Sequence, residues 1–405
     1  MPPVSSSSRK APPEERQPER ARTVVLRDAE HRLLALLAGG PATRAHLAAA
    51  AELPLTTTTS AVARLRQRRL VMELPSPPTG SRGRPAALVA VVPPRGLVAV
   101  LRLSRRCVAV SLVTLEGEVR AVRCAGFAAF DGAADERALP ALARRLLDQV
   151  LEPLAPVAVP EPVVAGVVSM PYPVTAAGAV ATVGGHLLSP RVGVPAPTWA
   201  LDGAAAGWEE RLGIPVVVEN DASLAALGET VGGAAAGALG AVCLRVRDGL
   251  GAGVVVDGRV VRGRTGLAGE VAHLRVGLDG PVCGCGGRGC LVGLPTTARA
   301  VAALEEDAPT DGALEDVRRL GTRLGSWVVD ACLAADPEVV VVDGPPGSGL
   351  QVLVRSVRAA VEAGAPAPVV AGVRVVPSAL GDDAVVRGAA ATARRLLAAG
   401  ARAQG

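Results

Sequence analysis

The chain has 405 residues, which is too long for one ordinary core and suits two or three domains. Apolar residues make up 49% of it but aromatic residues only 1%, which excludes a ligand site built on aromatic stacking. Residues 1–90 hold 14 basic and 7 acidic residues and the rest holds 29 and 31, so the basic front end indicates an anionic partner.

The first segment, residues 1–22, is rich in proline, serine and charge, and is predicted to be a disordered tail. It lacks the apolar core of a signal peptide, and the uncharged run at 162–190 is broken by prolines and glycines. The seven cysteines are then expected to be metal ligands and buried thiols rather than disulfides. We expect a cytoplasmic protein without membrane association.

Residues 24–68 predict three short helices. The first, 24–38, has apolar residues at helical spacing. The second, 43–52, begins at Thr43, which can cap it. The third runs from 55 to 68 after a break at Leu53-Pro54. Three short helices with a tight turn before the third are typical of a helix-turn-helix.

The third helix is expected to expose hydroxyl groups and an arginine, which suit base edges and phosphates. These residues are Thr57, Thr58, Ser60 and Arg64. Residues 70–92 form two apolar strands around a Pro/Gly/Arg loop and predict a wing, with Arg82 and Arg84 reaching a minor groove or phosphates. The alternative is a small helical interaction module with a solvated basic face. We assign 23–92 to a winged helix-turn-helix DNA-binding domain.

An α/β pattern follows. Residues 97–123 predict two strands with a turn at Glu116-Gly117, and a third strand is expected near 124–129. Further on we expect helices at 138–154, 297–306 and 313–335, and buried strands at 163–169, 214–218 and 339–344. Residues 241–262 repeat the hairpin pattern around a glycine-rich turn, Gly249–Gly253, which alone is weak evidence for phosphate binding.

Asn220 and Asp221 stand at a predicted strand end before a helix, where ligand groups gather in α/β folds. A carboxylate there can act as a general base toward a hydroxyl. The alternative is a helix cap, worth about 1 kcal/mol. The residues alone favour the cap.

The stretch GEVAHLRVGLDGPVCGCGGRGC, residues 269–290, concentrates metal-ligand chemistry. Thiolate sulfur and neutral imidazole are the preferred donors of tetrahedral Zn²⁺, and the glycines allow a tight fold. The predicted ligands are His273, Cys283, Cys285 and Cys290. Four protein ligands leave no open position, so we expect a structural site.

The same stretch resembles the signature of the ROK family (repressors, open reading frames, sugar kinases), and the likeness extends from about residue 27 to the C-terminus. It implies a two-lobed α/β fold of the actin-like, sugar-kinase (ribonuclease H-like) type at 95–400. The first lobe would span about 95–218 plus the C-terminal helix, and the second about 219–384. Residues 381–390 resemble the family's closing helix. Regulators of this family carry a winged helix-turn-helix ending in a similar RGRP, and they assemble as dimers or tetramers.

The resemblance also implies a sugar site. Asn220 and Asp221 would bind the sugar, and Asp221 matches the catalytic base of the family's kinases. Glu270 would bind sugar hydroxyls, and His273 would face the sugar while ligating zinc. The family's next sugar-binding glutamate is Val292 here, so one hydroxyl would lose its acceptor.

The kinases' first phosphate loop, Asp-x-Gly-x-Thr, is replaced here by Arg102, Ser104 and Arg106. Both the magnesium-binding carboxylate and the glycine that admits phosphate are absent. The turn at Gly249–Gly253 still resembles the second phosphate loop. The Gly-Gly pair where the kinases hold adenosine is Asp343-Gly344. The resemblance therefore implies a degenerate ATP site and no enzyme activity, with Asp221 as a vestigial base.

We expect a sugar-responsive transcriptional repressor that binds an operator in double-stranded DNA, Zn²⁺ and a sugar or sugar-phosphate effector, as a homodimer or tetramer. One alternative is an active sugar kinase with an appended DNA-binding domain. Another, kept open by Val292, is a DNA-binding protein whose larger domain binds no ligand and serves only for assembly.

Overall fold

The computed structural model describes residues 28–37, 40–67, 71–74, 87–91, 96–104, 107–126, 138–151, 162–183, 186–187, 204–247 and 249–403. The tail expected at 1–22 lies outside them. The chain divides into two compact units, residues 1–92 with 399–405, and residues 93–398. Among the described residues, no helix is both long and apolar enough to cross a membrane.

The N-terminal unit combines three helices with a small antiparallel sheet. The helices are α1 (Asp28–Leu37), α2 (Arg44–Ala50) and α3 (Leu55–Gln67). The strands are β1 (Ala42–Thr43), β2 (Val71–Leu74) and β3 (Leu88–Val91), in the order β1-β3-β2. The core is made of the apolar residues Leu33, Leu37, Leu47, Ala51, Ala61, Val62, Leu65, Val71 and Val89.

The local signals in this unit act as the sequence predicts. Thr43 caps α2, its hydroxyl accepting a hydrogen bond from the His46 N–H at 3.2 Å. The turn into α3 is tight because Glu52 adopts a left-handed φ of 52° and the Leu53 N–H bonds back to the Ala48 carbonyl at 2.9 Å. The break at Leu53-Pro54 therefore lies where it was expected.

The first lobe of the larger unit is built on a five-stranded mixed sheet in the order β10-β7-β4-β5-β6. Its strands are β4 (Leu97–Leu103), β5 (Cys107–Thr114), β6 (Val119–Gly126), β7 (Val163–Met170) and β10 (Val216–Asn220). Strands β4, β5 and β6 are antiparallel, whereas β7 runs parallel to β4 and β10. Helices α4 (Ala138–Leu151) and α5 (Ala204–Leu212) and a ribbon of β8 (Thr182–Val183) and β9 (His186–Leu187) complete it.

The strand boundaries here correct one expectation. Residues 97–123 hold β4, β5 and the start of β6 rather than two strands, and the turn at Glu116-Gly117 joins the second and third. The cause is burial: β4 and β5 are buried along nearly their whole length on both faces, so no apolar and polar alternation marks the break between them.

The second lobe has a five-stranded sheet in the order β13-β12-β11-β14-β15. Its strands are β11 (Ala241–Val246), β12 (Leu250–Val256), β13 (Arg259–Val260), β14 (Val339–Asp343) and β15 (Arg374–Pro377). Helices α7 (Pro295–Leu304), α8 (Asp311–Ala335), α9 (Ser348–Gly364) and α10 (Ala367–Gly372) belong to it. So do two short 3₁₀ helices, η3 (Val271–His273) and η4 (Leu291–Gly293).

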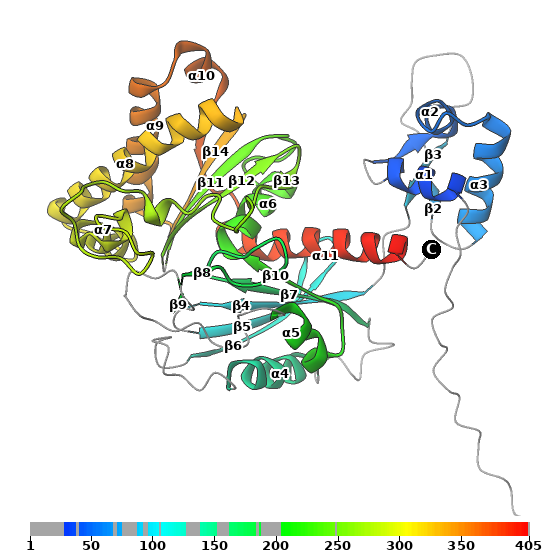
Figure 1. Ribbon diagram of the computed structural model, residues 1–405, viewed down its shortest axis with the longest axis horizontal. Coiled ribbons are helices and arrows are strands. Elements are labelled where there is room, and N and C mark those ends of the chain that lie inside the picture. Colours follow the sequence, from blue (N-terminus) through cyan, green and yellow to red (C-terminus); the bar gives the residue numbers. More distant parts are fainter. Residues whose placement is uncertain are drawn as a thin grey trace, which may run out of the picture. The chain divides into compact units, whose positions relative to one another are not determined.

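Two helices, α6 (Asp221–Gly232) and α11 (Asp383–Ala403), lie between the two sheets (Figure 1). They share one core with Val98 and Val100 of β4 and with Val339 and Val341 of β14. The two helices pack so closely that a Cβ on Gly228 of α6 would lie 1.9 Å from the Ala384 carbonyl oxygen of α11, so only glycine fits there. The expected closing helix is therefore present and packs against the helix that starts at Asp221.

Candidate functional site

Asn220 and Asp221 occupy the junction between β10 and α6. The Asn220 side chain caps the helix, accepting from the Ser223 N–H at 3.0 Å and donating to the Tyr172 carbonyl at 3.1 Å. The Asp221 carboxylate accepts from the Ala222 N–H at 2.9 Å. Its other oxygen pairs with Arg245 Nε at 3.1 Å. The capping alternative is thus observed, and both side chains are held in place.

Glu270 comes from a distant part of the chain, directly before η3. The preceding residue, Gly269, ties this segment to β12, because the Gly269 carbonyl accepts from the Ala252 N–H at 2.9 Å. Gly269 has a φ of +84°, and a Cβ on Gly269 would lie 2.1 Å from the Ala252 oxygen. Burial, and then the negative charge of Asp221, raise the pKa of Glu270 to about 7. The two carboxylates that the resemblance assigns to a sugar therefore influence each other electrostatically.

The four predicted metal ligands converge in the loop after Glu270. The donor atoms of His273, Cys283, Cys285 and Cys290 all lie within 4.8 Å of one another. The Cys283 sulfur is 3.5 Å from His273 Nδ1, and the Cys285 and Cys290 sulfurs are also 3.5 Å apart. Three sulfurs and one imidazole nitrogen at these separations fit the edges of a Zn²⁺ tetrahedron with bonds of about 2.0–2.3 Å.

The backbone of this loop requires its glycines. Gly286 and Gly289 have φ of +86° and +66°, and a Cβ on Gly289 would lie 1.9 Å from the Gly277 oxygen. Burial lowers the pKa of His273, which keeps the imidazole neutral and able to act as a ligand. Burial and the neighbouring thiols raise the pKa of Cys290 to about 12. Thiols packed this closely ionise together only with a cation, so the donor set fits a metal.

Val292, which replaces a sugar-binding glutamate of the family, lies in η4. It is partly buried and packs against the core of the second lobe. It brings no acceptor for a sugar hydroxyl.

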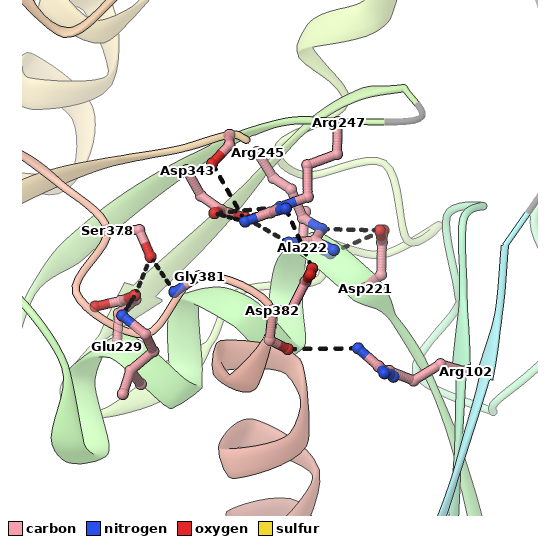
Figure 2. Close-up of polar contacts among 12 residues, drawn as sticks. Arg102, Asp221, Ala222, Glu229, Arg245, Arg247, Asp343, Ser378, Gly381 and Asp382 are labelled. Atoms are coloured by element: carbon pink, nitrogen blue, oxygen red, sulfur yellow. Dashed lines mark hydrogen bonds and ion pairs between the residues drawn. The ribbon is translucent and has the colours of Figure 1, made fainter. Parts of the chain in front are cut away.

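Beside Asp221, five charged residues of alternating sign are joined by ion pairs, and a sixth, Arg102, joins them through a hydrogen bond to a backbone carbonyl (Figure 2). We call this series the ion-pair chain. Its members, in order, are Asp221, Arg245, Asp343, Arg247, Asp382 and Arg102. They come from α6, β11, β14, the segments after β11 and before α11, and β4. The ion-pair chain therefore links residues of both lobes.

The middle of the ion-pair chain is buried. Asp343 is fully buried and pairs with the guanidinium groups of both Arg245 and Arg247, the latter at 2.7 Å. The Arg245 and Arg247 side chains are only 12% and 16% exposed. Arg245 faces Asp343 because the two residues are register partners in the parallel pair β11 and β14. The Asp343 that departs from the family's Gly-Gly is thus neutralised by two arginines.

The end of the ion-pair chain at Asp382 and Arg102 is more exposed. Arg247 pairs with Asp382, whose side chain is 69% exposed, at 3.2 Å. Arg102 lies near the end of β4, and its Nη1 is 3.5 Å from the Asp382 carbonyl oxygen. The Arg102 Nε is buried without a hydrogen-bond partner among the described residues. Arg102 therefore extends from the first lobe toward the start of α11.

The other phosphate-loop positions serve turns and packing. The Ser104 hydroxyl accepts from the Cys107 N–H at 3.0 Å, and Arg106 lies outside the described residues. Most of the expected glycine-rich turn belongs to strand β12, where Gly253 is required by packing, because a Cβ there would lie 2.3 Å from the Ala222 oxygen of α6. The glycines after β11 thus have a structural use independent of phosphate.

A buried carboxylate on α6 fixes the segment before α11 (Figure 2). Glu229 is fully buried and accepts from the Ser378 hydroxyl at 2.5 Å and from the Leu380 N–H at 3.1 Å. It also accepts from the Ala234 N–H at 2.6 Å. Helix α6 therefore carries Asp221 at its start and, two turns later, the anchor of the segment that presents Asp382.

In the N-terminal unit, two of the predicted DNA-contacting side chains point inward or are already paired. Thr57 and Ser60 are exposed, but Thr58 is fully buried because it shares the inward face of α3 with Val62 and Leu65. Its spacing of four and seven residues from them is that of one helix face.

Arg64 is not free either. It pairs at 2.5 Å with Glu30 of α1, whose side chain is fully buried. Thr56 and Thr59, which the sequence reading left out, are exposed on α3. Arg82 and Arg84 lie outside the described residues.

Sequence reasoning also missed Arg245, Arg247 and Asp382. An available signal was the pair of arginines directly before the glycine-rich turn, Arg245-Val246-Arg247, since arginines at the end of a buried strand require acidic partners.

A family model described as "ROK family" matches residues 188–396, just over half of the chain. The chain is 32% identical over 169 residues to a glucokinase of Streptomyces coelicolor, covering 34% of this chain and 53% of the relative. It is 26% identical over 194 residues to a xylose repressor of Bacillus spizizenii, covering 44% and 50%. The chain thus spans about half the length of these curated relatives.

Among solved structures, a ROK family transcriptional regulator described as a homolog of the E. coli MLC protein superposes with a TM-score of 0.68 at 23% identity. The match covers 93% of this chain and 97% of that one. At this identity the likeness shows the fold alone. The expected two-lobed sugar-kinase-like fold is confirmed.

Proposed function

Because the chain belongs to the ROK family, we propose that it is a sugar-responsive DNA-binding transcriptional repressor and not a sugar kinase. Both kinds of protein occur among its relatives, a glucokinase and a xylose repressor. The choice between them rests on the chemistry of the residues around Asp221.

The observation that carries the proposal is the ion pair between Asp221 and Arg245, 3.1 Å long. A kinase needs this carboxylate free to take a proton from the sugar hydroxyl as phosphate arrives. Here one oxygen is engaged by a guanidinium that is itself locked to the buried Asp343. This pairing with the positively charged, nearly buried Arg245 favours a carboxylate that accepts hydrogen bonds from hydroxyls over one that acts as a general base.

The residues at the positions where the family's kinases hold the nucleotide support the same conclusion. Arg102 and Ser104 supply neither a magnesium ligand nor the open backbone that a phosphate approaches. Arg247 and Asp343 neutralise each other where the family holds the nucleotide. The competing activity, sugar phosphorylation, is favoured by the similarity to the glucokinase and by the glycine-rich turn.

For the effector, we propose a sugar or sugar phosphate bound by Asn220, Asp221, Glu270 and His273. Asp221 and Glu270 are near enough for one charge to perturb the other, and a pair of carboxylates is suited to accepting several hydroxyls. The third possibility, a domain that binds no ligand, is favoured by Val292, which offers no acceptor.

For DNA, we propose that α3 enters the major groove and that the β2–β3 hairpin is a wing. Thr57 and Ser60 would contact base edges, joined by Thr56 and Thr59 on the same exposed surface. Arg82 and Arg84 would contact phosphates. Thr58 and Arg64 would support the helix from within, as their burial and pairing suggest.

We further propose that His273, Cys283, Cys285 and Cys290 hold one structural Zn²⁺. The ion would cross-link the loop that carries His273 to the segment preceding α7, and no residue of the set would be left for catalysis. A homodimer or tetramer in the cytoplasm, reading a two-fold-symmetric operator, suits a regulator of this design.

Two assays on the full-length protein test the proposal. Selection from a random duplex library is expected to enrich a two-fold-symmetric site. A coupled assay of ADP release with ATP, Mg²⁺ and D-glucose, D-xylose or N-acetyl-D-glucosamine is expected to show no turnover. Turnover at ordinary enzyme rates, about 1–10³ per second, establishes the kinase instead.

A further inference from the structure

The ion-pair chain joins the proposed sugar site to the start of α11. At one end Asp221 belongs to the sugar site, and at the other Asp382 directly precedes α11. Three carboxylates are linked by the guanidinium groups of Arg245 and Arg247, and Arg102 donates to the Asp382 backbone carbonyl. Arg245 and Arg247 are each paired with two carboxylates of the series, which leaves neither to bind an anionic ligand and points to an internal role.

Its members compete for one another. Arg245 is shared between Asp221 and Asp343, and Arg247 between Asp343 and Asp382. Around the fully buried Asp343 the interactions are strong, and a change in one of its pairs alters the other. When sugar hydroxyls donate to Asp221, its hold on Arg245 weakens. Arg245 then turns further to Asp343, which releases Arg247 toward Asp382.

The receiving end is suited to register that shift. Glu229 anchors the segment at Ser378 and Leu380, so Asp382 extends from a fixed base. Gly381 has a φ of +55°, and a Cβ there would lie 3.5 Å from Arg247 Nη2. Arg102 of the first lobe donates a hydrogen bond to the Asp382 carbonyl. A stronger pair between Arg247 and Asp382 therefore tightens the first turn of α11 against both lobes.

We propose that the ion-pair chain transmits sugar occupancy from Asp221 to the start of α11, as an electrostatic latch between the lobes. The proposal rests on the proposed binding of sugar at Asp221. It assigns Arg247 and Asp382, which do not contact the sugar, to the regulation of that site.

Hydrogen exchange on the full-length protein tests the latch. The probe is whichever of D-glucose, D-xylose, N-acetyl-D-glucosamine and D-glucose 6-phosphate binds most tightly by calorimetry. We expect saturating sugar to slow exchange in peptides covering residues 378–385, where the Asp383 and Ala384 amides bond to Leu380 and Gly381. The slowing is expected to be about 2- to 30-fold, the range for residues that modulate coupling.

Two variants interrupt the chain without emptying its core. Asp382→Asn changes an exposed side chain, and Arg247→Gln leaves Asp343 paired with Arg245. Both are expected to keep the sugar dissociation constant within about 3-fold and to lose the protection at 378–385. The matched control is Asp148→Asn, which removes a 55% exposed carboxylate from a 3.0 Å pair on α4. It is expected to keep the full protection.

The outcomes separate the two proposals. The latch is overturned, and sugar binding left intact, if sugar binds to the wild type without slowing exchange at 378–385. It is also overturned if sugar slows this exchange as much in the two variants as in the wild type. If none of the four sugars binds, both proposals fail.

Discussion

Replacing Asp343 with asparagine should destabilise the larger unit strongly. The Asp343 carboxylate is fully buried and neutralises Arg245 and Arg247, which are themselves at least 84% buried by their exposures of 12% and 16%. Breaking a buried ion pair by removing one partner costs about 3–5 kcal/mol, because a charge is left uncompensated. Asparagine keeps one oxygen acceptor, so we expect Asp343→Asn to cost about 3 kcal/mol, at the lower end of that range.

Urea unfolding followed by tryptophan fluorescence measures this, because the three tryptophans of the chain, Trp199, Trp208 and Trp327, all lie in residues 93–398. The control Asp148→Asn breaks an exposed pair and should cost less than about 1 kcal/mol. A loss below about 1 kcal/mol for Asp343→Asn refutes the reasoning.

Three further predictions concern other parts of the chain. Wild-type protein purified without added metal should contain about one zinc per chain by elemental analysis, and Cys285→Ser less than a third; equal contents argue against the four-ligand site. Glu229→Gln should cost at least about 1.5–3 kcal/mol in the same urea assay, because one carboxylate oxygen accepts from Ser378 and Leu380 and the other from Ala234, so the new NH2 group faces a donor in either orientation; an unchanged midpoint contradicts this. Arg64→Ala should remove the guanidinium partner of the buried Glu30 and speed amide exchange in α1 and α3; exchange at the wild-type rate shows that the pair is dispensable.

Much of the fold was predictable because its signals are local. Thr43 caps α2 through its own hydroxyl, and the cysteine spacing from 283 to 290 places three sulfurs on one short loop. The tight turn before α3 follows from Leu53-Pro54. Each of these features depends on residues within about ten positions of one another, so the sequence displays them directly.

The ion-pair chain was not predictable in the same way. Arg245 meets Asp343 only because β11 and β14 pair in parallel, and 98 residues separate the two in sequence. Arg102 and Asp382 are 280 residues apart. Periodicity assigns such residues to strand ends without choosing their partners. By contrast, the placement of Thr58 on the exposed face of α3 was avoidable, because Ala61, Val62 and Leu65 already mark the inward face.

The central claim is that a sugar bound at Asp221 and Glu270 controls DNA binding. The most direct measurement is titration of the selected duplex with full-length protein, with and without the binding sugar, for wild type and Glu270→Ala. We expect the sugar to change the wild-type dissociation constant for DNA by about 5- to 150-fold. Glu270→Ala should bind DNA like wild type without sugar and show no response to it. A variant that responds like wild type, or a wild type that does not respond at all, contradicts the account.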